Sequence, residues 1–110
     1  MDDHPSFRAV ARRLLEADGY EVVGEQPDGE SGVSAVATLR PDVVLLDVHL
    51  PGIDGFEAAS RIRAAGNGTA VILTSSRDAS DFGPLVEASG ALGFVAKGDL
   101  SGAALHALLS

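Results

Sequence analysis

The sequence alternates short apolar runs rich in β-branched residues with longer segments in which apolar residues recur at helical spacing. A continuous apolar run is typical of a strand buried on both faces, as in a parallel sheet. The predicted strands are 21–25, 43–48, 70–76 and 93–97, and the predicted helices are 5–18, 33–39, 56–63, 79–89 and 102–109. Strict alternation of helix and strand predicts an α/β domain with helices on both faces of one parallel sheet.

Turn and cap residues divide these elements. Pro5 suits the first turn of a helix capped by Asp3 or His4, and Ser101 suits the cap of the last helix. Asp28-Gly29 is predicted to be a turn. Gly83-Pro84 falls inside the segment 79–89. Because proline is tolerated only near the first turn of a helix, this helix is expected to be short or irregular.

Composition excludes several classes of protein. The chain has 110 residues, enough for one domain, with 8 basic and 16 acidic residues and a net charge of −8. This balance argues against direct nucleic-acid binding, which needs clustered lysine and arginine. The absence of cysteine excludes disulfides and thiolate metal sites. The sequence contains neither a signal peptide nor an apolar run of roughly 20 residues that could span a membrane. A cytoplasmic domain is expected.

Polar residues follow the predicted strands where an α/β sheet binds its ligands, beyond the carboxyl ends of the strands. An acidic pair also precedes the first helix. These residues are Asp47, Thr74, Ser75 and Lys97, together with the pair Asp2 and Asp3. Taken singly, most have ordinary explanations, as helix-start charges, a surface lysine or a β-branched strand residue. Asp47 is different, because an acidic side chain that closes a buried strand is costly without a partner.

Three neighbouring carboxylates either take up protons or bind a cation. Oxygen ligands without cysteine favour a hard ion such as Mg²⁺. A lysine beside them could neutralise an incoming phosphoryl group, and a carboxylate can act as the nucleophile that becomes an aspartyl-phosphate. His4, His49 and His106 have no metal-ligand spacing and are interpreted as structural or solvated.

Five segments resemble the receiver domain of bacterial two-component response regulators, in the same order and over almost the whole chain. They are DDHPSFR, EVVGEQPDG, RPDVVLLDVHLPGIDGFEAASRIR, VILTSS and GALGFVAKGDL. The resemblance implies a flavodoxin-like (βα)5 fold that receives a phosphoryl group from a histidine kinase with the help of Mg²⁺. The first two segments are similar to the subgroup that precedes a helix-turn-helix output domain. By this resemblance, residues 1–110 are a receiver unit without an output domain.

The resemblance also implies the ligands of the metal. Asp47 is the phospho-acceptor and a metal ligand. Asp2 and Asp3 match the family's acidic pair, with Asp3 as the direct ligand and Asp2 acting partly through water. The backbone carbonyl of His49 is the remaining expected protein ligand.

The phosphoryl group has its own expected contacts. Thr74 matches the hydroxyl that bonds the phosphoryl group, ahead of Ser75. Lys97 matches the lysine that pairs with it. Phe94 matches the aromatic switch position, here without a hydroxyl group.

Three features depart from the family pattern. Gly98 follows Lys97 where many relatives have proline, so a cis Lys-Pro turn is not available. Gly83-Pro84 lies in a helix that often contributes to the partner face.

The first strand, central in the family's order 2-1-3-4-5, is missing before Asp2. Its loss could exceed the roughly 5–15 kcal/mol of a domain's stability. We therefore expect that the reading frame is started too late, or else that Mg²⁺ binding is weak and stability is low.

The function expected from this resemblance is a signalling module rather than an enzyme. Its expected partners are a histidine kinase and a second copy of the chain in a homodimer, without nucleic acid or membrane. The alternative is a phosphorylation-independent receiver that serves only as a protein-interaction module. An aspartate-based phosphatase is disfavoured because it usually has a second acid two residues after the first, where this chain has His49.

Overall fold

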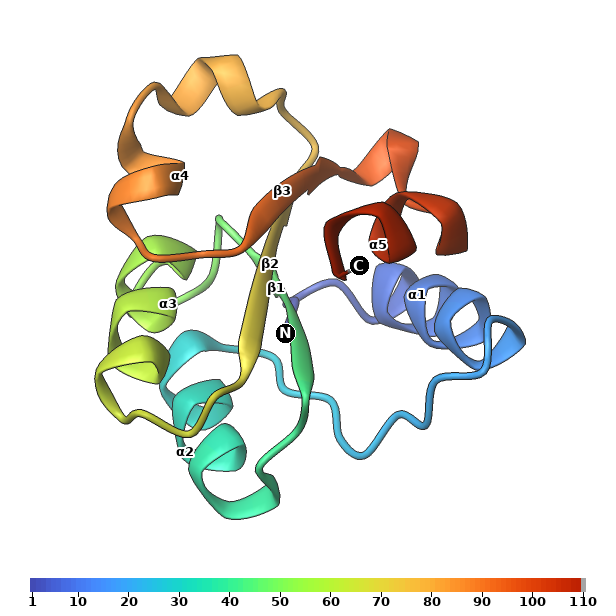
Figure 1. Cartoon of the computed structure of the whole chain (residues 1–110), viewed down its shortest axis with the longest axis horizontal. Coiled ribbons are helices and arrows are strands. Elements are labelled where there is room, and N and C mark those ends of the chain that lie inside the picture. Colours follow the sequence, from blue (N-terminus) through green and yellow to red (C-terminus); the bar gives the residue numbers. More distant parts are fainter. Residues whose placement is uncertain (110) are drawn as a thin grey trace.

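The computed structural model describes residues 1–109 and contains a sheet of three parallel strands (Figure 1). The strands are β1 (Val43–Asp47), β2 (Ala70–Ser75) and β3 (Gly93–Ala96), in the order β1-β2-β3. Each lies within one residue of a predicted strand. The parallel pairing places Val44 opposite Val71 and Ile72 opposite Gly93. The carboxyl ends of all three strands therefore meet at one edge of the sheet.

Helices cover both faces of the sheet, as predicted (Figure 1). They are α1 (Pro5–Ala17), α2 (Gly29–Leu39), α3 (Gly55–Ala64), α4 (Leu85–Ala88) and α5 (Gly102–Leu109), with short 3-10 turns η1 (Ala79–Phe82) and η2 (Lys97–Asp99). No helix in the described part of the chain is both long enough and apolar enough to cross a lipid bilayer.

Two apolar clusters hold these layers together. On one face, Leu46 and Leu73 pack with residues of α2 and α3 such as Val36 and Ile62. On the other face, Ile72 packs with Leu105 of α5, beside Leu15 of α1. Successive side chains of a strand point to opposite faces, so a strand must be apolar at every position to serve both clusters.

The strand predicted at 21–25 is wrong. These residues have no strand pairing, and a cavity of about 510 Å³ separates them from the edge of β1. Just after this segment, the carbonyl of Gln26 accepts a hydrogen bond of 3.1 Å from Asp2 N, next to Met1 at the edge of β1. A β-branched sequence forms a strand only when a neighbouring strand meets its backbone groups, and no strand in the described part of the chain pairs with 21–25.

The turn predicted at Asp28-Gly29 is instead the start of α2. The Asp28 carboxylate accepts a hydrogen bond from Ser31 N at 2.8 Å, so the helix begins four residues before the first apolar residue of its predicted stripe. The other cap predictions are confirmed. His4 occupies the cap position before Pro5, and Ser101 Oγ accepts a bond from Ala104 N at 3.0 Å.

The predicted irregularity at 79–89 is confirmed. The segment divides into η1 and the single turn of α4, separated by Gly83. Gly83 has φ of 56° and ψ of −130°, a backbone conformation that strongly favours glycine. The proline after it then begins α4 rather than interrupting a helix.

We predict that Leu46→Ala lowers the free energy of unfolding by about 2–5 kcal/mol, because Leu46 is fully buried and its loss leaves a cavity. Urea unfolding checks this value. Leu92→Ala is the matched control, since Leu92 is half-exposed and its truncation should cost under about 1 kcal/mol. Equal losses for the two variants would contradict the assigned core.

Candidate functional site

The site lies at the carboxyl edge of the sheet, where three strands deliver one polar side chain each. Asp47 ends β1 and is in register with Thr74 of β2. Thr74 is in turn in register with Val95 of β3, two residues before Lys97. Asp47 and Thr74 are buried. The sheet therefore brings together the acceptor, hydroxyl and lysine residues that the sequence analysis selected.

Lys97 is the only lysine of the chain, and it lies between two buried carboxylates. Its Nζ is 2.7 Å from Asp2 Oδ2 and 3.0 Å from Asp47 Oδ2. Both aspartate side chains are 3% exposed, whereas the lysine side chain is 18% exposed. Burial excludes most solvent from these ion pairs, which strengthens the attraction between their charges.

The three charges shift one another's pKa values. For Asp47, burial is the largest effect and, with the nearby Asp2 carboxylate, it raises the pKa of the carboxyl despite bonds from His49 N and Lys97. Burial also acts to raise the pKa of Asp2, but bonds from Lys97 and other donors outweigh it and lower that pKa. Burial alone would lower the pKa of Lys97, yet the two carboxylates raise it. Asp2 thus carries the negative charge, and Asp47 takes up a proton first.

Hydrogen bonds of Met1 and Arg8 hold Asp2 in this position. Met1 N donates to Leu45 O at 2.6 Å, and Asp47 N donates to Met1 O at 2.9 Å. Arg8 donates from its guanidinium to the carbonyl oxygen of Asp2. The two bonds of Met1 hold its backbone along the edge of β1. The side chain of the next residue, Asp2, therefore reaches the site.

The loop between β1 and α3 orients the Asp47 carboxylate and brings the start of α3 close to β1. His49 N donates to Asp47 Oδ1 at 3.0 Å, which orients the carboxylate. Asp54 caps α3 by accepting a bond from Glu57 N. A Cβ on Gly55 would lie 2.3 Å from the carbonyl oxygen of Asp47, so only glycine allows α3 to begin this close to β1.

Four side chains could together hold a cation. Asp2, Asp3, His4 and Asp47 each place a ligand atom within 4.8 Å of the others. Asp2 Oδ2 is buried, and it forms an ion pair with the Lys97 ammonium at 2.7 Å. Carboxylate oxygens from three aspartates fit a hard ion such as Mg²⁺. Direct coordination by Asp3, coordination partly through water by Asp2, and coordination by the His49 carbonyl remain predictions.

The hydroxyl of Thr74 is available to a ligand. Thr74 Oγ1 is buried and has no hydrogen-bond partner among the described residues, a costly state that a bound oxyanion would relieve. Ser75 Oγ, in contrast, accepts a bond from Arg77 N at 3.1 Å. This difference favours Thr74 over Ser75 as a ligand-binding hydroxyl, and the role of Thr74 stays a prediction.

Sequence reasoning missed three contributors from the start of α1. His4 Nδ1 lies 3.0 Å from carboxylate oxygens of both Asp2 and Asp3. The Lys97 ammonium lies 4.3 Å from the centre of the Phe7 ring, a cation–π contact. Arg8 contacts the Asp2 carbonyl. Their signal was proximity in sequence, since all three lie within five residues of Asp3, but this spacing alone did not distinguish them from ordinary helix residues.

Phe94 lies in an aromatic cluster beside the site rather than next to Lys97. Its ring centre is 5.9 Å from that of Phe82, which contacts Phe56 at 5.5 Å and His49 at 5.9 Å. The cluster connects β3, η1 and the loop after Asp47. Phe94 is therefore connected to the loop after Asp47 through Phe82, and its switch role stays a prediction.

We predict that Asp47→Asn raises the free energy of unfolding by about 1 kcal/mol at pH 7 in metal-free buffer, because it removes repulsion from Asp2. The folded chain holds the Asp47 proton more tightly than the unfolded chain does. The stability this provides is present below the ordinary aspartate pKa of about 3.9 and is lost as pH rises through the raised value.

The difference in free energy of unfolding between Asp47→Asn and the parent chain should therefore appear above about pH 4. Urea unfolding at a series of pH values measures this difference. Asp54→Asn is the control, since asparagine caps a helix as well as aspartate does. A variant less stable than the parent at pH 7, or a gap that is the same at pH 3 and pH 7, contradicts the shared-charge site.

Comparison with known proteins identifies similar chains. A family model described as response regulator receiver domain matches residues 1–109. The DNA-binding transcriptional activator EvgA of Escherichia coli (strain K12) is 35% identical over 97 residues, which are 88% of this chain and 48% of EvgA. This chain spans about half the length of the curated relatives it matches.

Solved structures are similar over nearly the whole chain. The signal receiver domain of a Mycobacterium tuberculosis protein assigned as the response regulator NarL has a TM-score of 0.87 and 34% identity, covering 99% of this chain and 92% of that one. A two-component response regulator of the LuxR family from Aurantimonas sp. SI85-9A1 has a TM-score of 0.85 and 34% identity, covering 96% and 76%.

Proposed function

Because this chain belongs to the family of response regulator receiver domains, we propose that it accepts a phosphoryl group on Asp47 from the phosphohistidine of a histidine kinase. The carboxylate oxygen of Asp47 forms a bond to phosphorus while the bond between phosphorus and the histidine nitrogen breaks. The electron pair of that bond stays on the imidazole. The product is an aspartyl-phosphate, and release by water returns the carboxylate.

The observation that carries this proposal is the shared position of Lys97. Its ammonium lies within 3.0 Å of both buried carboxylates. Thr74, whose buried hydroxyl has no hydrogen-bond partner among the described residues, is in register with Asp47 on the neighbouring strand. When the acceptor carboxylate becomes an aspartyl-phosphate, Lys97 is near enough to pair with a phosphoryl oxygen, and Thr74 can donate to another. Phosphoryl transfer depends mainly on such positioning and charge stabilisation.

The acidic cluster has a second task in this proposal. Asp2, Asp3 and Asp47, with the His49 carbonyl, would hold Mg²⁺. The ion supplies positive charge that reduces repulsion between the anionic carboxylates and an incoming phosphoryl group. His49 N orients the acceptor carboxylate, while the buried walls of the site limit access of water.

We propose that the receiver unit covers residues 1–110, acts in the cytoplasm, and passes its signal through a surface that a partner or a second copy recognises. A transcriptional output is proposed because relatives such as EvgA are described as transcription activators. The phosphorylation-independent interaction module is the second candidate. The cavity beside Met1 favours it, since loose support of Asp2 would weaken the metal site.

Incubation with a small phosphodonor and Mg²⁺, followed by intact-mass measurement, separates the two candidates. We expect a gain of one phosphoryl group that is lost in Asp47→Asn and retained in the matched variant Asp54→Asn. Chelation of Mg²⁺ should abolish the gain. A folded parent chain that gains nothing under these conditions would support the interaction module instead.

The Thr74 hydroxyl offers a second prediction. Thr74→Val keeps the shape but removes the hydroxyl, and should slow phosphoryl uptake by at least about tenfold, the usual effect of removing one donor to a transition state. Thr74→Ser keeps the donor and should retain most of the rate. Rates from the same mass assay check this, and equal rates for valine and threonine would remove Thr74 from the site.

A further inference from the structure

The aromatic ring of Phe7 contacts the candidate site rather than the apolar core. Phe7 is the third residue of α1 and is half-buried, and the Lys97 ammonium lies 4.3 Å from the centre of its ring. The other three phenylalanines, Phe56, Phe82 and Phe94, form the aromatic cluster beside the site. Among the described residues, Phe7 belongs to neither apolar cluster of the core. Core packing therefore does not account for a large ring at this position.

The ring is the third close neighbour of the Lys97 ammonium. Asp2 Oδ2 lies 2.7 Å from Nζ, and Asp47 Oδ2 lies 3.0 Å from it. An ammonium group has three N–H donors, and these two oxygens can accept from two of them. The face of an aromatic ring attracts a cation that lies within about 6 Å of its centre. Phe7 therefore gives the lysine charge a third attractive contact.

The chemical character of this contact matters because the site is already acidic. Asp2, Asp3 and Asp47 lie together, and an incoming phosphoryl group brings further negative charge. A further carboxylate beside Lys97 would hold the ammonium, but it would also repel that group and compete with it for N–H donors. The ring attracts the ammonium through its quadrupole and carries no net charge. Phe7 can thus hold Lys97 without opposing the arrival of a phosphoryl group.

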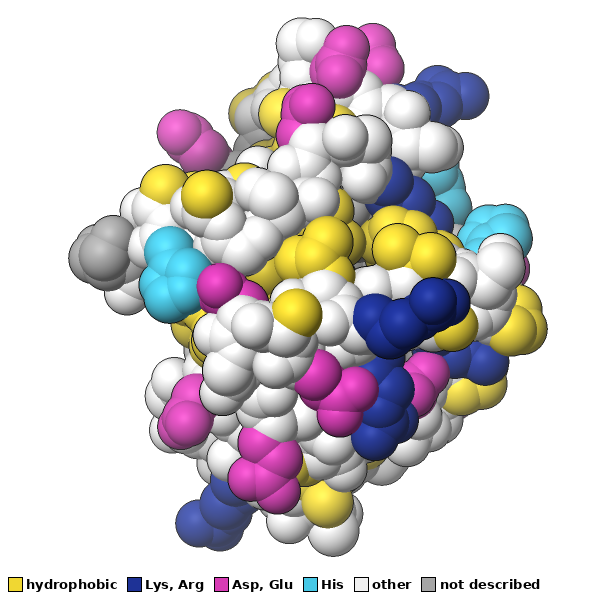
Figure 2. All heavy atoms as spheres, turned by 90° about the vertical axis from the view of Figure 1, so that its right-hand side faces the viewer, with side chains coloured by type: hydrophobic (Ala, Val, Ile, Leu, Met, Phe, Trp, Pro, Cys, Tyr) yellow, Lys and Arg dark blue, Asp and Glu magenta, His cyan; other side chains and the backbone are white. Residues whose placement is uncertain are grey.

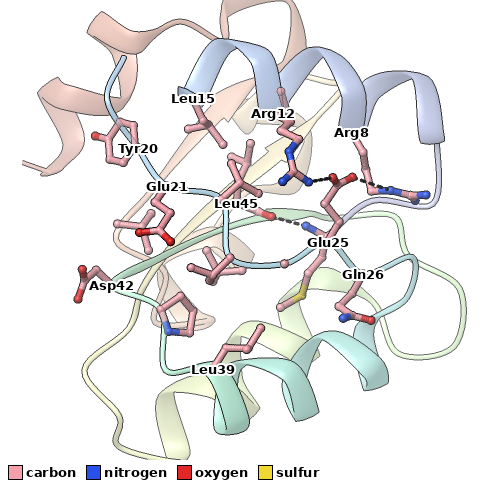
Figure 3. Close-up of a pocket in the computed structure, with 18 of the residues that line it drawn as sticks. Arg8, Arg12, Leu15, Tyr20, Glu21, Glu25, Gln26, Leu39, Asp42 and Leu45 are labelled. Carbon is pink, nitrogen blue, oxygen red and sulfur yellow. Dashed lines mark hydrogen bonds and ion pairs between the residues drawn. The ribbon is translucent and has the colours of Figure 1, made fainter. Parts of the chain in front are cut away.

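Surface ion pairs fix the part of α1 from which Phe7 projects. Figure 2 shows basic and acidic side chains beside one another on the face that carries α1 and α5. Arg8 and Arg12 both pair with Glu25, at 3.4 Å and 2.6 Å (Figure 3). Arg8 also donates to the carbonyl oxygen of Asp2. These contacts limit rotation of the first turns of α1 about the helix axis, so the Phe7 ring stays directed at the site.

The lysine side chain benefits from such a support because a flexible four-carbon stem joins its ammonium to the backbone. Lys97 is the first residue of the short turn η2, and its side chain is 18% exposed. Without a further contact, the ammonium could leave Asp47 and pair with Asp2 alone, or turn toward solvent. A ring beside the end of the stem restricts both alternatives.

We propose that Phe7 is a positioning residue for phosphoryl transfer, whose ring holds the Lys97 ammonium beside Asp47. This inference rests on the proposed function, in which Lys97 pairs with a phosphoryl oxygen. It adds a residue that acts through Lys97 rather than on the phosphoryl group itself. When Asp47 becomes an aspartyl-phosphate, the ammonium exchanges one anionic oxygen for another while its contact with the ring persists.

The first arm of the test observes the contact without any phosphoryl transfer. As the only lysine, Lys97 gives unique side-chain NMR signals, and protons over the face of a ring are shifted upfield by its ring current. In the full chain we expect an upfield shift of the Lys97 ε-methylene protons and nuclear Overhauser effects to the Phe7 ring. Phe7→Leu, which keeps an apolar side chain without a ring, should lose both. Phe56→Leu is the matched control and should leave the Lys97 signals unchanged.

The second arm measures the rate of phosphoryl uptake from acetyl phosphate in the presence of Mg²⁺. In this step the Asp47 oxygen bonds to phosphorus while acetate leaves with the electron pair of its bond to phosphorus. Phe7→Leu should lower the rate about fivefold, the effect of losing a typical cation–π contact from the transition state. Phe7→Tyr keeps the ring face and should retain most of the rate.

Fluorination of the Phe7 ring separates its electrons from its shape. Successive fluorine atoms withdraw charge from the ring face and weaken its attraction for a cation, with little change in volume. We expect the uptake rate to fall stepwise from the parent to the trifluorinated ring. The same series at Phe56 is the matched control and should leave the rate unchanged. Because the ring keeps its shape, this series decides the outcome even if Phe7→Leu fails to fold.

The outcomes separate this inference from the proposed function. Uptake by the parent chain with a constant rate across the fluorinated series would overturn the role of Phe7 and leave Asp47 as the acceptor. No uptake by a folded parent chain would overturn the proposed function and, with it, the part of Phe7 in transfer. Lys97 signals that do not respond to Phe7→Leu would overturn the contact itself, whatever the uptake. A stepwise fall in rate together with loss of the upfield shift supports the proposal.

Discussion

The ion pair of Lys97 with two buried carboxylates is the interaction on which the site depends. Asp2 and Asp47 are almost fully buried, and without a cation between them their like charges could not both persist. The parallel sheet makes this ion pair possible, because its strands place Asp47 and Lys97 at the same edge. In the proposed function, the ammonium that pairs with the two carboxylates would also pair with the phosphoryl group.

The weakest support of this arrangement is on the side of Asp2. Asp47 and Lys97 follow paired strands, whereas Asp2 follows one residue held at the edge of β1 and is bonded to an unpaired segment. A large apolar cavity lies behind it. Met1 and Asp2 therefore connect the candidate site to the cavity, which both residues line.

Much of this structure follows from the sequence, and the failures have physical causes. The flavodoxin-like receiver fold is confirmed, and apolar runs placed β1, β2 and β3 within a residue because both faces of those strands are buried. The strand predicted at 21–25 does not form, because strand propensity is a local property and no described strand pairs with this segment. The association of Asp2, Asp47 and Lys97 could be expected from strand ends, but the Phe7 contact depends on helix orientation, which spacing leaves open.

The most direct measurement is the pKa of Lys97 itself. As the only lysine, it gives a single side-chain ammonium signal in ¹⁵N NMR, free of overlap from other lysines. The account predicts a pKa above the ordinary lysine value of 10.5, with a fall toward that value in Asp47→Asn. A pKa at or below 10.5 in the parent chain, unchanged by the substitution, would show that the ammonium does not lie between the two carboxylates.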